Sequence, residues 1–71
     1  MSDITLGDRV SWNWGNGTGS GEVRERFEED VTRVLKGTEV TRTASAACPA
    51  FLIVQEDGDE VLKSASELTK S

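Results

Sequence analysis

The residues able to carry chemistry in this chain are charged side chains and a few aromatic rings. The 71 residues include 13 acidic and 8 basic residues, one cysteine and no histidine. Histidine is the usual general base at neutral pH, and the carboxylates here fall in turns that we expect to be solvated. Cys48 lies between Ala47 and Pro49, with no basic neighbour to favour the reactive thiolate. The sequence therefore does not predict an enzyme.

A second candidate chemistry is ion binding by the acidic residues that crowd one late turn, namely Glu56, Asp57, Asp59 and Glu60. Their order lacks the regular oxygen ligands of an EF-hand loop. A zinc site needs several cysteines or histidines, which the chain does not have. We expect a solvated turn here, with no metal ion and no cofactor.

The glycine-rich segment from Gly15 to Gly21 raises the question of phosphate binding. Backbone N–H groups of such a loop can face an anion. However, the segment lacks the Gly-Lys-Ser/Thr ending of a P-loop and leads into a strand rather than a helix. With four glycines in seven residues, it is predicted to be a flexible loop without regular structure.

Basic residues concentrate in the middle of the chain, and four of them are candidates for a binding face: Arg24, Arg26, Arg33 and Arg42. If they share one exposed face, they form a basic stripe suited to a nucleic acid. Alternatively, they pair across strands with Glu22, Glu28 or Glu39 and hold the strand register. We favour pairing, because the net charge of −5 opposes non-specific binding to phosphates.

The elements that position these residues are short strands. Alternation predicts strands over 8–14 and 22–27, with Val10, Trp12, Val23 and Phe27 facing inward. Lys36-Gly37 predicts the turn of a hairpin over 31–35 and 38–43, although a helix over 26–35 competes. The continuous apolar run 51–54 predicts a strand covered on both faces, followed by an Asp57-Gly58 turn and a return strand over 60–63. Ser64 and Glu67 have capping-box spacing for one helical turn that carries Leu68 onto the core, and the last residues are expected to fray.

Length and hydropathy limit the remaining possibilities. Seventy-one residues suit one domain with a small core, and no apolar run approaches the length of a membrane span. Residues 1–5 lack the basic start and apolar middle of a secretory signal, so we expect a cytoplasmic protein. Five or six short antiparallel strands with one helical turn predict a small closed or nearly closed barrel around a single interior.

Several blocks of sequence resemble one known family. They are Gly7-Asp8-Arg9-Val10-Ser11-Trp12, Gly21-Glu22-Val23, Lys36-Gly37, Pro49 to Ile53, Gln55 to Gly58, and Val61 to Ser64. Together they resemble the hypervirulence-associated Tudor domain family, over about residues 7–68. The resemblance implies a Tudor-like, SH3-like barrel spanning the single domain 1–71, and it implies little about biochemical activity.

Tudor relatives that read methylated side chains use several convergent aromatic rings. Here Trp12, Phe27 and Phe51 fall at core positions, so the sequence does not predict a cage. Trp14, at a strand end beside the glycine segment, is the best candidate for an exposed ring. We expect a non-enzymatic module that binds a protein or peptide through Trp14, Asn16 and nearby charged strand positions; the alternative is weak nucleic-acid binding through the four arginines.

Overall fold

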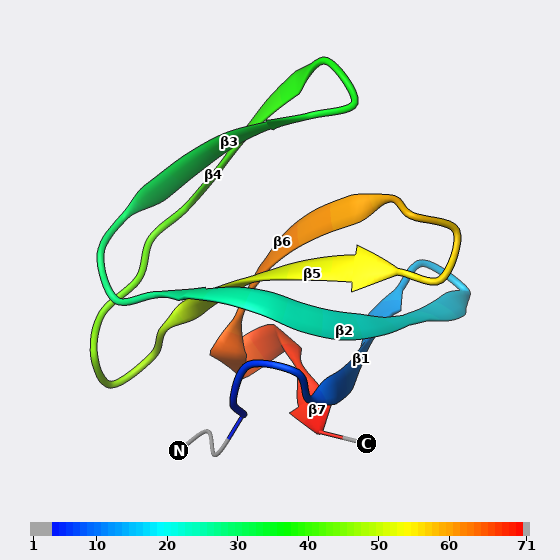
Figure 1. The fold of residues 1–71 in the computed structure, drawn as a ribbon, viewed down its shortest axis with the longest axis horizontal. Helices are drawn as coiled ribbons and strands as arrows, with labels where there is room; N and C mark the ends of the chain where they lie inside the picture. The colour runs from blue at the N-terminus through cyan, green and yellow to red at the C-terminus, as the bar shows by residue number, and fades with distance from the viewer. Residues whose placement is uncertain (1–3, 71) are drawn as a thin grey trace.

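The computed structural model describes residues 4–70, which form seven β-strands and one 3₁₀ turn (Figure 1). In chain order these are β1 Arg9–Trp14, β2 Gly17–Phe27, β3 Val31–Leu35, β4 Thr38–Arg42, β5 Ala50–Gln55, β6 Glu60–Ser64, η1 Ala65–Glu67 and β7 Thr69–Lys70. The predicted mostly-β fold is confirmed. The strand count exceeds the expected five or six partly because Thr69 and Lys70, predicted to fray, pair with Ser11 and Val10. No helix among residues 4–70 is long and apolar enough to cross a bilayer.

Five strands form one antiparallel sheet in the order β6-β5-β2-β1-β7, and β3 and β4 form a separate hairpin. In a flat sheet of this order the two edge strands would lie roughly 19 Å apart. The chain passes from edge β6 to edge β7 through residues 65–68 alone, and three of these form a 3₁₀ turn that rises only about 2 Å per residue. The sheet must therefore curl toward a barrel, so that its two edges approach each other. β7, which pairs with β1, lies below β5 and β6 in Figure 1.

The core consists of two apolar clusters rather than the single interior expected. The first contains Ile4, Val10, Trp12, Val23, Phe51 and Ile53. The second contains Val31, Ala50, Leu52 and Leu62, with Leu35 and Val40 of the hairpin packed against it. Because neighbouring residues of β5 enter different clusters, this strand is covered on both faces, as its continuous apolar sequence predicts.

A β-bulge in β2 explains why the predicted inward face of this strand is only half correct. The register with β5 shifts between Val23 and Glu25, which leaves Arg24 as the extra residue. A bulge changes the face on which the following side chains lie. Val23 consequently packs in the first cluster and Phe27 against the second, whereas simple alternation placed them on one face.

The prediction of an irregular loop over Gly15–Gly21 is wrong beyond its first two residues. Only Gly15 and Asn16 form the turn, and β2 begins at Gly17. The later glycines serve close packing. A β-carbon on Gly19 would lie 2.6 Å from the indole of Trp12, and one on Gly21 would lie 2.5 Å from the carbonyl oxygen of Val54. The same glycines that indicated flexibility therefore allow two close approaches within the sheet.

The hairpin of β3 and β4 has the turn that its sequence predicts. Lys36 and Gly37 have φ angles of 54° and 76°, and positive φ at both central residues defines the type I′ turn that suits tight hairpins. The competing helix over 26–35 does not form. At the C-terminal end, Glu67 Oε1 accepts a hydrogen bond of 2.8 Å from the backbone N–H of Ser64, as expected of a capping box. Leu68 packs on the first cluster, as predicted.

Candidate partner-binding surfaces

Trp14 stands at the tip of the β1–β2 hairpin with 62% of its surface exposed. It shares a strand face with Trp12, which is only 6% exposed. The difference arises because Trp12 lies within the sheet, where it packs in the first cluster. Trp14 lies opposite Gly17, which carries no side chain to cover the indole. An exposed indole on a strand is able to bury a large area against a partner at little conformational cost.

This hairpin tip extends beyond its neighbouring strands. Within the described residues, β7 pairs with β1 only at Val10 and Ser11, and β5 pairs with β2 only from Gly21 onward. Residues 12–14 and 17–19 therefore pair with each other but with no third strand. Their outer edges present unpaired backbone groups of the kind that accept an added strand.

Asn16 occupies the second position of the two-residue turn, next to Trp14. Gly15 before it has a φ of 49°, and the exposed Asn16 has an ordinary negative-φ backbone. A turn with a positive φ only at its first central residue is typical of type II′. Asn16 and Trp14 are thus two predicted site residues on the same hairpin tip.

The four arginines do not form one basic stripe. Arg24 lies at the bulge, Arg26 and Arg33 line a pocket at the corner between β2 and β3, and Arg42 lines a groove between β4 and β6. Each is paired with a carboxylate: Arg24 with Glu22 at 3.4 Å, Arg26 with Glu28, Arg33 with Glu25 at 3.2 Å, and Arg42 with Glu67 at 3.3 Å. The preferred pairing therefore holds. The predicted cross-strand geometry is wrong for two of the pairs, because Glu22 and Glu28 are close to their arginines along the chain rather than opposite them in a ladder. Glu39 is not a partner of any of the four arginines.

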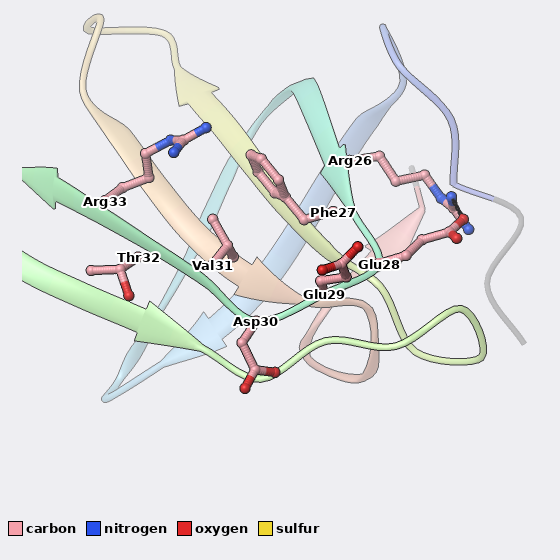
Figure 2. A pocket seen from close by; sticks show the side chains of 8 residues that line it. All are labelled: Arg26, Phe27, Glu28, Glu29, Asp30, Val31, Thr32 and Arg33. Atoms are coloured by element: carbon pink, nitrogen blue, oxygen red, sulfur yellow. Dashed lines mark hydrogen bonds and ion pairs between the residues drawn. The ribbon is translucent and has the colours of Figure 1, made fainter.

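The corner pocket has a volume of about 430 Å³ and is shown in Figure 2. Its one aromatic ring belongs to Phe27, and the guanidinium of Arg33 lies 4.9 Å from the ring centroid. Asp30 turns away from this ring, and its Oδ1 accepts a hydrogen bond from the backbone N–H of Ala44. The face that would attract a cation is therefore covered by the chain's own Arg33.

Three of the four acidic residues in the turn at residues 56–60 have separate partners. Glu56 pairs with Arg9 at 3.7 Å, and Asp59 pairs with Lys36 at 2.6 Å. Asp57 accepts a hydrogen bond from the backbone N–H of Asp59. No group of three or more potential metal ligands converges among residues 4–70. The arrangement is typical of a solvated turn that forms ion pairs with neighbouring segments.

Two ionisable groups with shifted pKa values, Asp8 and Lys36, form ion pairs with residues distant in the sequence. Asp8 accepts hydrogen bonds from the backbone N–H and the hydroxyl of Thr5, and it lies 3.4 Å from the ammonium of Lys70. These contacts, the backbone N–H first, lower the pKa of Asp8. The hydrogen bond and charge of Asp59 raise the pKa of Lys36. Both groups lie outside the Trp14 tip and hold structure rather than build a reactive centre.

The curled five-stranded sheet and the hairpin over it place this protein in the class of small β-barrel-like folds. The sequence model described as "Hypervirulence associated proteins TUDOR domain" matches residues 7–68. The chain therefore belongs to the hypervirulence-associated Tudor domain family, as its sequence blocks predict. Tudor-type domains are generally non-catalytic binding modules, so membership indicates a binding module. No significant match was found among curated proteins or solved structures.

Proposed function

We propose that the chain is a single Tudor-like domain, with its core at residues 7–68, that binds a protein or peptide partner without catalysing a reaction. The observation that carries this proposal is the exposed indole of Trp14 at the tip of a hairpin whose outer edges are unpaired. An aromatic side chain of this kind is a typical anchor of a protein interface. The neighbouring Asn16 adds an amide able to donate and accept hydrogen bonds.

The nucleic-acid alternative receives less support. Its four arginines lie on different parts of the molecule, and each already has a carboxylate partner. Binding to phosphates would have to break these pairs on a chain with a net charge of −5. Because phosphate contacts supply most of the affinity in non-specific binding, we do not assign this activity to the protein.

Capture from the native cell with three forms of the protein tests the proposal: wild type, Trp14→Ala and Val34→Ala. Val34 provides a matched control because it is 68% exposed and lies on β3, away from the tip. We expect Trp14→Ala to lose partners that Val34→Ala retains. Identical partner sets for all three forms would contradict the assignment of Trp14, and a partner set consisting of nucleic acid would contradict the proposal itself.

A further inference from the structure

The tip of the β1–β2 hairpin has two free edges, and the backbone hydrogen bonds distinguish them. Val23 exchanges hydrogen bonds with Gly7 and Asp8, on the side of β2 that faces β1. Alternate residues of a strand direct their N–H and C=O groups to opposite sides, so Thr18 and Ser20 direct theirs away from β1. No strand pairs with this side of either residue, and among residues 4–70 no other backbone group bonds to it. These two residues define the β2 edge.

The fold leaves the β2 edge open because β5 ends beside it. Gln55 is the last residue of β5 that pairs with β2, opposite Gly21. Gln55 donates its N–H to the carbonyl of Asp59 and accepts a hydrogen bond from the N–H of Gly58, which closes the turn toward β6. The chain therefore leaves the line of β5 at this point, and a further strand in that line would lie beside the β2 edge.

The indole of Trp14 favours the β2 edge over the outer edge of β1. Two of its ring atoms lie 3.9 Å from the position of a β-carbon on Gly17, so the ring lies across β2 and remains 62% exposed. A strand added at the β2 edge would place side chains next to this ring. On β1 the corresponding outward backbone is that of Asn13 alone, because β7 already pairs with Ser11.

The charge beside the β2 edge is negative. Residues 11–20 include no charged side chain, and the turn between β5 and β6 lies at the same end of the sheet (Figure 1). The four carboxylates of that turn pair with only two cations, Arg9 and Lys36, which leaves a net charge of −2. Lys63 lies over the buried ring of Trp12, 5.8 Å from its centroid. A partner that brings a cation to the turn is therefore favoured.

We propose that the β2 edge binds an extended, basic segment of a partner protein as an added strand, an inference that rests on the proposed function of the Trp14 tip. The backbone of the segment pairs with Thr18 and Ser20. An apolar side chain packs on the exposed indole of Trp14, and a lysine or arginine lies beside the acidic turn, near Asp57. Alternation allows this, because successive side chains of the segment point to opposite faces of the sheet.

The first test titrates the full chain, labelled with ¹⁵N, with the acetylated and amidated peptide Lys-Val-Thr-Val-Thr-Val-Lys. Its valines can share the face of Trp14, and either strand direction brings one lysine beside the acidic turn. We expect the largest amide shifts at residues 14 and 17–21. A peptide with Glu in place of Lys should bind at least about threefold more weakly, because it places like charges beside each other.

Two further probes carry N-methyl groups on either the threonine or the valine amides of this peptide. In antiparallel pairing, the residues opposite Thr18 and Ser20 form the hydrogen bonds and share their outer face, so methylated threonines should abolish binding. In parallel pairing, the residues on either side of these form the bonds, so methylated valines should abolish it. Only one of the two probes should lose binding, and equal effects of both would overturn the proposal.

Matched proline variants separate the two edges of the tip. Thr18→Pro removes an N–H from the β2 edge, and Asn13→Pro removes the corresponding N–H from the outer edge of β1. Proline is tolerated where a strand N–H faces solvent. We expect Thr18→Pro to weaken peptide binding at least about fivefold and Asn13→Pro to leave it within about twofold. Asp57→Asn should weaken binding of the lysine peptide about two- to fivefold and leave that of the glutamate peptide no weaker.

Unchanged binding to Thr18→Pro, tighter binding of the glutamate peptide, or no shift at residues 17–21 at millimolar peptide would each overturn the added strand. The methylated peptides are tested on the wild-type protein and do not depend on the folding of either proline variant. Partner capture keeps this inference separate from the proposed function. Capture that is lost in Trp14→Ala but kept in Thr18→Pro would retain the tip and reject the strand, whereas capture unaffected by Trp14→Ala would reject the tip itself.

Discussion

At the residue scale, glycines 17 and 19 show how neighbouring positions of one residue type serve different purposes. Both lie on β2 opposite a tryptophan of β1. At Gly19 an added β-carbon would lie 2.6 Å from the Trp12 ring, whereas at Gly17 it would lie 3.9 Å from the Trp14 ring. The first distance requires the buried indole to move and the second is an ordinary contact. Composition alone did not distinguish them, because a glycine needed for close packing looks the same in sequence as one needed for flexibility.

Replacing Gly19 with alanine is therefore expected to destabilise the protein by about 1–3 kcal/mol, the usual cost of overpacking a core. The matched change Gly17→Ala should alter the free energy of unfolding by less than about 0.5 kcal/mol, as for an ordinary surface position. Urea unfolding followed by tryptophan fluorescence measures both. Equal effects of the two changes would show that Trp12 is not held as described.

Asp8 gives a pH dependence whose sign follows from its contacts. Its pKa is lowered, first by the hydrogen bond from the Thr5 backbone and also by Lys70. A carboxyl with a lowered pKa in the folded state stabilises the protein above its unfolded value, near 3.8, and this stabilisation is lost as the pH falls through the folded value.

We expect Asp8→Asn to lower the free energy of unfolding at neutral pH, because asparagine carries no charge for Lys70. The difference from wild type should shrink as the pH falls below 3.8. Chemical denaturation at a series of pH values measures it, with Glu29→Gln as a control that removes a carboxylate without an ion pair in the described structure. If the difference in the free energy of unfolding between Asp8→Asn and wild type stayed constant from neutral to strongly acidic pH, the ionisation of Asp8 would not be its cause.

At the scale of elements, the β3–β4 hairpin is attached more weakly than the strands beneath it. It shares no ladder with the five-stranded sheet. Its attachments are the packing of Val31, Leu35 and Val40 on the second cluster and the ion pairs that Arg33, Lys36 and Arg42 form with residues outside the hairpin. Segments with few buried contacts open at lower free energy than the core of a sheet. The hairpin itself was predictable from its β-branched arms and Lys36-Gly37 turn, but its position over β6 was not, because that depends on contacts between distant segments.

Native-state hydrogen exchange should accordingly show faster exchange for amides of β3 and β4 than for those of β2 and β5. Arg42→Gln removes one attachment and should speed exchange in the hairpin about two- to fivefold, the effect of losing an exposed ion pair, while leaving β5 unchanged. Arg24→Gln, which breaks an ion pair within β2, serves as the control and should not affect the hairpin. Equal exchange rates in all strands would contradict the inference that the hairpin is held more weakly than the strands of the five-stranded sheet.

At the scale of the whole molecule, the fold and the site were predictable to different degrees. Strand periodicity, turn residues and the blocks shared with the Tudor family indicated a small barrel-like β fold. The division of the core into two clusters was not predicted, because simple alternation placed Val23 and Phe27 on one face and the bulge at Arg24 separates them. We predicted correctly that Trp14 is exposed and Trp12 buried, because Trp14 lies at the end of its strand. The dispersal of the arginines could not be inferred, because side-chain positions across the corner and the groove depend on the curl of the sheet.

The most direct measurement of the central claim is the affinity of a purified captured partner for wild type, Trp14→Ala and Val34→Ala, obtained by titration at low and raised salt. Loss of a central aromatic anchor typically costs about 2 kcal/mol or more. We therefore predict that Trp14→Ala weakens binding at least about thirtyfold, that Val34→Ala leaves it within about twofold, and that salt has a modest effect. Equal affinities for the three forms would contradict the assignment of the binding surface to the Trp14 tip.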